Sequence, residues 1–292
     1  MPYNGNGFNW DQGRWNSLNQ VVHDASREMR LIRPLLKLYG TQGDYVRTIA
    51  GHQVNNGLPA QPGQPRQPLS VDVNQNVVPV KLWCEFRLRQ EQFYDEDTAT
   101  SLAIEAAYRV AQAEDAVILL GADAAGFLTG LNVQMDPGQL EGQQSLLLGI
   151  PPKVDRPPPG SSNSPSQNYI TESIIQGIRE LQRNGRYSRY AAIVGLKLYE
   201  DSMRPRGGRA FSAEIYELRV LLGENRFLYS PALPDRGGVI FSLSGDGIKI
   251  AVPVDARVEL VEENRDVTLQ VVEQIRLLVD VPQAAVALRS PP

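Results

Sequence analysis

The segment GADAAGFL, residues 121–128, carries two glycines five positions apart, which is the glycine spacing of a phosphate-binding loop. In such a loop a lysine and a hydroxyl residue follow the second glycine and contact the phosphates and a magnesium ion. Phe127 and Leu128 occupy those two positions, so the groups needed for phosphate chemistry are missing. The preceding residues repeat apolar side chains at helical spacing, and Gly121 is therefore predicted to end a helix. The repeating residues are Leu102, Ala106, Val110, Ala113, Val117 and Leu120.

Cysteine and histidine, which supply many catalytic nucleophiles, bases and zinc ligands, are scarce in this sequence. The 292 residues include one cysteine, Cys84, and two histidines, His23 and His52. A structural zinc site normally needs four such ligands, and neither HxxxH nor CxxC spacing occurs. We therefore expect no catalytic residue, no metal, no cofactor and no internal disulfide, with His23 on a helix face and His52 in a loop.

The charge balance argues against a nucleic-acid partner. The formal net charge is −4, whereas nucleic-acid binders usually show a basic excess. No apolar run reaches the length of a membrane span, and the N-terminal MPYNGNGFNW lacks the basic start and apolar stretch of a secretory signal. We expect a cytoplasmic protein with no membrane partner and no nucleic-acid partner.

Arginine dominates the basic side chains. Five lysines leave 24 arginines among the 29 basic residues. Arginine is favoured in buried ion pairs and at interfaces, because its planar guanidinium holds a carboxylate by two hydrogen bonds. A genomic preference for arginine codons predicts the same count, so both explanations stay open.

Helical and strand patterns occur without a regular strand–helix–strand repeat, which predicts an α+β fold. Residues 14–33 have the pattern of an amphipathic helix, and residues 78–88 alternate apolar and polar side chains as a strand does. Between them, residues 40–78 form a long polar excursion rich in glycine and proline, which is uncommon inside a compact domain. YDEDTATS, residues 94–101, supplies acidic and hydroxyl groups for the start of the long helix that ends at Gly121.

The second half begins with a stretch rich in proline, glycine and serine, residues 132–168, which we expect to be a surface loop. Periodicity then predicts helices at 170–185, 196–203 and 214–223 and a short buried strand at 190–195. The last part of the chain is predicted to hold strands at 237–244, 247–252, 256–262, 267–279 and 284–288. SGDG and EENRD are the expected hairpin turns.

Four segments resemble the encapsulins, shell proteins of bacterial nanocompartments that share the capsid fold of tailed phages such as HK97. The first two are RWNSLNQVVHDASREMRLIRPLLKLYGTQG from residue 14 and VVPVKLWCEFRLRQEQF from residue 77. The third, AAYRVAQAEDAVILLGADAAGFLTGL from residue 106, is similar to the family's long spine helix. The fourth, GGVIFSLSGDGIKIAVPVDARVELVEENRDVTLQVVEQIRLLVDVPQAAVAL from residue 237, is similar to its closing sheet.

The resemblance implies a structural protein and not an enzyme, with an HK97-like capsid fold of the α+β class. The implied parts are an N-terminal helix and peripheral-domain segment at 11–48, an extended loop at 49–77, the strand and spine helix of the peripheral domain at 78–126, an axial domain at 127–235 and the closing sheet of the peripheral domain at 236–292. A neighbouring copy would support the extended loop, which accounts for its length.

Family members assemble into an icosahedral homo-oligomer, a virus-like particle that encloses a cargo enzyme. The implied partners are further copies of this chain, in a shell of triangulation number T=1 or larger, and a cargo protein with a short C-terminal loading peptide. In the family this peptide docks between the N-terminal helix and the closing sheet, which indicates Trp15, Leu18, Val22 and Ile32. Packing of the helix onto its own domain explains the same four side chains.

The family also places the turn after the axial helix near a fivefold axis. Here that turn is DSMRPRGGRAFS, with Arg204, Arg206 and Arg209, and a ring of arginines around a pore favours small anions. A solvated basic loop is the simpler interpretation. Some members hold a flavin against a tryptophan just after the strand at 80–88, but RQEQFYD contains no tryptophan, so we expect no flavin.

Two alternatives stay open. A phage or prophage major capsid protein has the same fold and packages DNA, which the negative net charge mildly disfavours. A soluble enzyme with its site in residues 132–168 would need a nucleophile, acid or base constellation there, and that stretch contains none.

Overall fold

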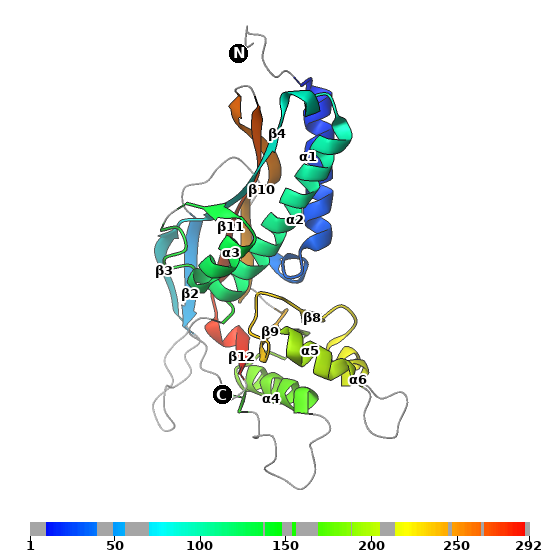
Figure 1. Ribbon diagram of the computed structural model, residues 1–292. Helices are drawn as coiled ribbons and strands as arrows, with labels where there is room; N and C mark the ends of the chain where they lie inside the picture. The colour runs from blue at the N-terminus through cyan, green and yellow to red at the C-terminus, as the bar shows by residue number, and fades with distance from the viewer. Residues whose placement is uncertain are drawn as a thin grey trace.

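The computed structural model describes residues 10–39, 49–55, 70–136, 138–147, 154–155, 169–187, 189–204, 214–244, 247–263 and 266–289. Two five-stranded sheets and one two-stranded ribbon carry the fold, with helices packed on the two larger sheets (Figure 1). This arrangement confirms the predicted α+β class. Among these residues, no helix is long and apolar enough to cross a bilayer.

The first sheet has the strand order β1-β10-β11-β4-β5. Its strands are β1 (Lys37–Leu38), β10 (Ile248–Glu263), β11 (Val267–Val279), β4 (Val80–Leu88) and β5 (Gln134–Met135). Buried side chains alternate along β4 as the sequence predicted, so one face of the sheet is apolar. Helices cover that face, with α1 (Gln12–Met29) packed against β10 and α2 (Glu96–Leu120) against β4 and β11.

The second sheet has the strand order β6-β12-β9-β7-β8. Its strands are β6 (Val154–Asp155), β12 (Ala285–Arg289), β9 (Gly237–Ser242), β7 (Tyr190–Val194) and β8 (Phe227–Tyr229). Helices α4 (Tyr169–Arg183) and α6 (Glu214–Leu222) pack on one face, and α5 (Leu196–Met203) lies beside α6. Side chains of the other face join the core of the first sheet. Strand β7 is therefore buried along its whole length, which explains its unbroken apolar sequence.

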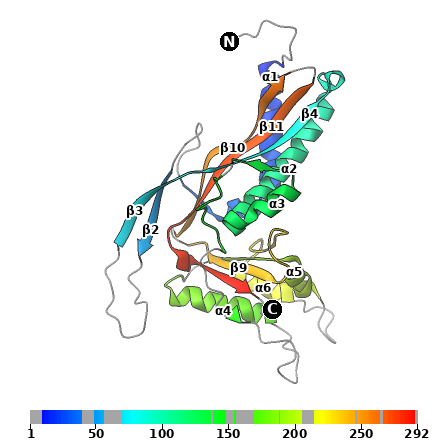
Figure 2. The ribbon, with the colours of Figure 1, turned by 60° about the vertical axis from the view of Figure 1, so that its left-hand side comes forward.

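Strands β2 (Ile49–Asn55) and β3 (Ser70–Val77) pair antiparallel with each other as a separate ribbon. Figure 2 shows this ribbon extending away from both sheets. The sequence predicted an extended excursion in this region, and residues 56–69 of it lie outside the described part. His52 belongs to β2, so the loop predicted for that residue is wrong.

The C-terminal strands are distributed over both sheets, whereas the sequence suggested a single closing sheet. Strands β10 and β11 form a long hairpin in the first sheet, while β9 and β12 pair with each other in the second. The two strands predicted at 247–252 and 256–262 are one strand, β10. Its pairing is irregular near Pro253, which has no N–H to donate, and register shifts carry the strand past this residue.

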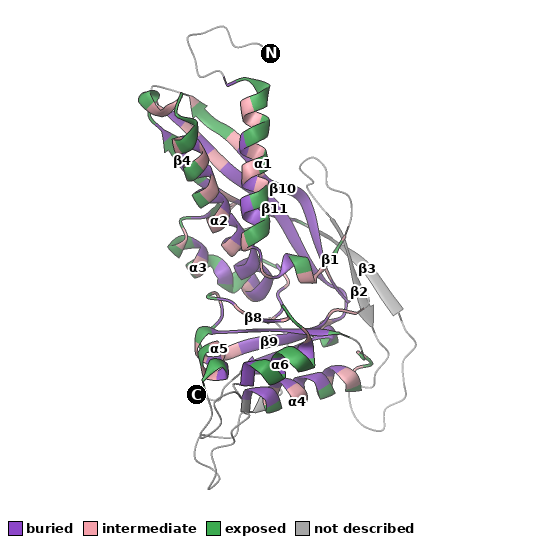
Figure 3. Cartoon of the chain, turned by 90° about the vertical axis from the view of Figure 1, so that its right-hand side faces the viewer, coloured by how far each residue is buried: buried purple, intermediate pink, exposed green. Residues whose placement is uncertain are grey.

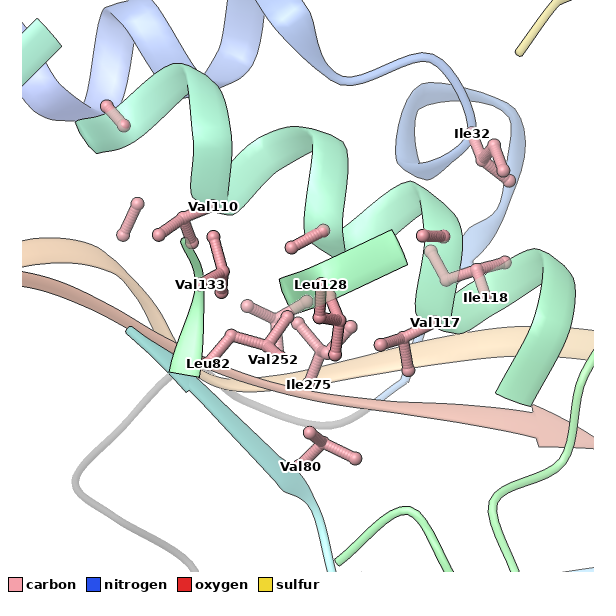
Figure 4. Packing of buried hydrophobic residues seen from close by; sticks show 14 of the residues in the cluster. Ile32, Val80, Leu82, Val110, Val117, Ile118, Leu128, Val133, Val252 and Ile275 are labelled. Atoms are coloured by element: carbon pink, nitrogen blue, oxygen red, sulfur yellow. The ribbon is translucent and has the colours of Figure 1, made fainter. Parts of the chain in front are cut away.

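Helix α2 contacts both α1 and the first sheet, and residues 113–119 are all buried. Figure 4 shows Val110 and Val117 of this helix among the buried side chains of the core. The helix ends at Gly121, whose φ of 59° is in the left-handed region. A Cβ at this position would lie 3.0 Å from the Gln143 carbonyl oxygen, so both conformation and space favour glycine. The predicted helix end is confirmed.

Part of the stretch predicted as a surface loop lies inside the molecule. The Leu146 N–H donates to the Ile118 carbonyl oxygen at 2.9 Å, and the Arg276 guanidinium donates to the Gly142 carbonyl oxygen at 2.9 Å. These hydrogen bonds satisfy backbone groups that have no strand partner, so an irregular segment is able to pack against the interior. The buried residues are Val133, Leu140, Gln143, Ser145 and Leu146. Most of the remaining stretch up to residue 168 lies outside the described residues.

Candidate docking face on helix α1

The first turn of α1 is fixed by a helix cap and by aromatic contacts. Asp11 accepts a hydrogen bond from the Arg14 N–H at 2.7 Å, which satisfies one free donor of the first turn. The Trp10 indole N–H donates to the Phe93 carbonyl oxygen at 3.1 Å. The Trp10 ring meets Trp15 edge-on, with centroids 5.2 Å apart, and the Arg14 guanidinium lies 4.2 Å from its centroid. These contacts hold the start of α1 beside the start of α2.

A hollow of about 510 Å³ lies between the first turns of α1 and α2. Its lining combines aromatic, aliphatic and polar side chains, including Trp10, Arg14, Leu18, Tyr94 and Thr100. Tyr94 is 90% exposed, so the hollow is open to solvent at this wall. Walls that are apolar and polar in similar measure offer both kinds of contact to a short peptide segment.

The other end of α1 is held by buried ion pairs. Arg30, which directly follows the helix, places Nη2 2.6 Å from Glu273 Oε1 and 2.8 Å from Asp255 Oδ1. Its Nε lies 2.8 Å from Glu114 Oε2. One guanidinium therefore joins the end of α1 to α2, β10 and β11.

Arg33, in the short 3₁₀ helix η1 (Arg33–Leu35), contacts the same three carboxylates. Its Nε and Nη2 donate to the two oxygens of Glu114 at 2.7 and 2.8 Å. Its Nη1 donates to Asp255 Oδ1 at 2.8 Å, and Nη2 also donates to Glu273 Oε1. We call these five residues, Arg30, Arg33, Glu114, Asp255 and Glu273, the ion cluster.

Two further titratable groups border the ion cluster. The carboxylate of Asp115 accepts hydrogen bonds from the Leu31 N–H at 2.9 Å and the Ile32 N–H at 3.0 Å. His23 Nδ1 lies 3.3 Å from Asp255 Oδ2. The chain that follows α1 is thus held through its backbone as well as through its side chains.

Burial and ion pairing shift the pKa values of these groups in opposite directions. Burial raises the pKa of Glu273 to about 8 and that of Asp115 to about 7. At Asp255 burial acts the same way, but the two guanidiniums outweigh it and lower the pKa to about 2. Burial disfavours the charge of Arg33 too, yet the carboxylates of Glu273 and Glu114 hold its pKa above the ordinary value.

A family match decides which group of proteins this fold belongs to. The family described as "encapsulating protein for peroxidase" (Linocin_M18) matches residues 6–276, nearly the whole chain. The chain belongs to the encapsulin family. None of the curated proteins compared with the sequence matches it.

Solved particle shells share the fold of this encapsulin. A virus-like particle from Pyrococcus furiosus aligns over 94% of this chain and 99% of its own, with a TM-score of 0.61 and 14% identity. The capsid of a native GTA particle aligns over 90% and 97%, with a TM-score of 0.60 and 12% identity. Gordonia phage Cozz aligns over 100% and 92%, with a TM-score of 0.56 and 12% identity. The predicted HK97-like capsid fold is confirmed, and family and fold together support a shell-forming structural protein.

The four side chains predicted to bind a cargo peptide differ in burial. Trp15 is partly buried, and Leu18, which is only 4% exposed and belongs to the buried core, lines the hollow of the encapsulin. Val22 and Ile32 are completely buried in the chain's own core, so they offer no area to a peptide, and at these positions the packing interpretation holds. Figure 3 shows buried and exposed stretches alternating along α1. Peptide binding at Trp15 and Leu18 stays a prediction.

The predicted pore turn is only partly described. Arg204 is exposed just after α5, with Nη1 3.4 Å from Asp201 Oδ1. Arg206 and Arg209 lie outside the described residues, so the anion pore stays a prediction. In the described part of this encapsulin, no group of three His, Cys, Asp or Glu side chains is arranged to hold a metal ion.

The ion cluster was not predicted from the sequence, although a signal for it exists. Glu114 and Asp115 stand in an otherwise apolar part of α2, and charged side chains are seldom buried without partners. Arg30 and Arg33 show that, at two positions at least, the abundant arginines of this encapsulin serve buried ion pairs.

Proposed function

We propose that copies of this chain close into an icosahedral nanocompartment in the cytoplasm, of triangulation number T=1 or larger, that encloses a cargo enzyme. The family match over residues 6–276 carries the proposal, because the described activity of that family is encapsulation of a peroxidase. The capsid fold is consistent with closure through repeated contacts around rotation axes. A peroxidase is therefore the first candidate cargo.

The β2–β3 ribbon supports assembly with further copies. A two-stranded ribbon by itself is only marginally stable in water, and this one extends away from both sheets of its own chain. A neighbouring copy that packs on the ribbon would bury it. The predicted role of residues 49–77 as an intersubunit arm follows from this argument.

We further propose that the cargo's C-terminal loading peptide docks beside Trp15 and Leu18. The open hollow next to Leu18 offers mixed apolar and polar walls for such a peptide. The fixed first turn of α1 supports this role, since a preorganised site loses less entropy on binding.

Co-expression with a peroxidase from the same genome, with and without its C-terminal tail, tests both parts of the proposal. We expect megadalton particles that retain the tailed peroxidase and exclude the tailless one. Trp15→Ser should lower the cargo content several-fold at unchanged particle yield, whereas Tyr216→Ser, at an exposed aromatic residue on α6, should not. Equal cargo in all samples would contradict the docking site, and absence of particles would contradict the shell.

A further inference from the structure

The ion cluster has an unequal number of charges. Glu114, Asp255 and Glu273 supply three carboxylates, whereas Arg30 and Arg33 supply two guanidiniums. The side chains of Glu114 and Glu273 are 0% exposed. If every group were ionised, one negative charge would lie uncompensated in the interior, which is strongly unfavourable. One bound proton restores the balance.

Glu273 is the carboxylate best placed to carry that proton. Its Oε1 accepts hydrogen bonds from both Arg30 and Arg33, whereas its buried Oε2 has no hydrogen-bond partner among the described residues. Glu114, in contrast, accepts hydrogen bonds at both of its oxygens. Asp255 contacts both guanidiniums and is partly exposed, which favours its ionised form.

We propose that Glu273 is protonated in the folded chain at neutral pH, and that loss of this proton in mildly alkaline solution loosens the end of α1 from the first sheet. Charged groups from four parts of the chain face Glu273. The groups that face it are Arg30 at the end of α1, Arg33 in η1, Glu114 in α2 and Asp255 in β10. We call this ion cluster the latch, because it holds the end of α1 on the first sheet and weakens as the pH rises.

Proton linkage gives the direction and size of the effect. The pKa of Glu273 is about 8 in the folded chain and 4.5 for the free side chain. Its contribution to stability is therefore fully present below the unfolded pKa and is lost as the pH rises through the folded one. Between pH 7 and pH 9 this group raises the equilibrium constant for opening the junction between α1 and the first sheet about tenfold.

Asp115 and His23 border the ion cluster, and Asp115 responds mainly below this range of pH 7 to pH 9. The pKa of Asp115 is raised to about 7, so this residue adds only about a twofold change above pH 7. His23 faces Asp255 from α1, with Nδ1 3.3 Å from Asp255 Oδ2 and a side chain that is 42% exposed.

Infrared titration of the purified full-length chain tests the proton directly. The carbonyl stretch of a protonated carboxylic acid is separate from the bands of a carboxylate. We expect a band at pH 8, where Glu273 is half protonated and Asp115 is mostly ionised, that loses most of its intensity by pH 9. The band should be much weaker at pH 8 in Glu273→Gln and unchanged in Glu105→Gln, a change at an exposed ion pair of α2. Glutamine is neutral and nearly isosteric, so it imitates the protonated acid. An identical acid band in wild type and Glu273→Gln would overturn the proposal.

Hydrogen exchange tests the latch in the wild-type chain, independently of any variant. After correction for the intrinsic effect of pH, the protection of α1 amides should fall about tenfold from pH 7 to pH 9, while that of α4 stays constant. Equal changes in α1 and α4 would overturn the latch. Weaker cargo docking in alkali would follow only if the proposed function holds, whereas both measurements here apply to the chain whether or not it forms a shell.

Discussion

The two five-stranded sheets hold their helices by different kinds of contact. On the first sheet, the end of α1 is held by ion pairs, and Arg33 alone contacts three carboxylates. On the second sheet, α4 and α6 are held by apolar side chains, with Ile174, Leu181 and Leu218 completely buried. One junction is therefore rich in ion pairs. The other is mainly apolar, with a buried hydrogen bond from the Thr171 N–H of α4 to the Glu214 carboxylate of α6.

This difference shows which helix the fold holds most tightly in one position on its sheet. Burial of apolar area is non-directional, so it tolerates small shifts of a helix. Guanidinium–carboxylate hydrogen bonds require fixed geometry, and a misplaced partner leaves a charge unpaired in the interior. We infer that α1, which carries the predicted docking residues, is fixed more exactingly than α4.

Arg33→Ala should have the largest effect. It leaves three buried or partly buried carboxylates facing one guanidinium, and we expect a loss of about 3–5 kcal/mol in the free energy of unfolding. Denaturant titration of the purified chain measures this loss. Arg109→Ala, which breaks an exposed pair with Glu105, is the control and should cost under about 1 kcal/mol. Equal losses in the two variants would show that the buried ion cluster stabilises the chain no more than an exposed ion pair does.

Ile174→Ala should have an intermediate effect, because it opens a cavity in the core beneath α4. We expect a loss of about 3 kcal/mol by the same titration, the same at pH 7 and pH 9 since no charge is involved. Val220→Ala, at a side chain that is 87% exposed on α6, should change stability little. A strong pH dependence of the Ile174→Ala loss would show that the two junctions are not distinct.

Asp11→Ala should have the smallest effect, confined to the first turn of α1. Loss of the helix cap should cost about 1 kcal/mol and speed hydrogen exchange there, away from the ion cluster. Asp11→Asn retains the accepting oxygen and serves as the control. If asparagine and alanine behaved alike, the cap would not account for the order of this turn.

Local patterns predicted the elements whose burial is periodic. The strand predicted from the alternation of β4 and the helix predicted to end at Gly121 are both present in the structure. Their periodic sequence patterns were informative because each element buries a defined set of side chains. The length of β10 was missed, since Pro253 interrupts the hydrogen-bond pattern without ending the strand. Register shifts of this kind depend on the partner strand, which local sequence does not specify.

The site was harder to predict than the elements, because its residues meet through contacts between distant parts of the sequence. Leu18 and Val22 belong to one apolar stripe of α1, and periodicity does not separate a core residue that lines a hollow from one that is fully enclosed. Arg30 and Glu273 lie 243 positions apart, so their contact emerges only when the sheet has brought β11 beneath α1. The resemblance to encapsulins predicted the fold, but the ion cluster was recognised only from the distances in the structure.

Electron cryomicroscopy of the purified full-length chain tests the central claim, that the chain is completed by copies of itself. We expect closed hollow icosahedral particles in which each β2–β3 ribbon lies against a neighbouring subunit. Dispersed monomers or small open oligomers at the same protein concentration, with no closed particles, would contradict it.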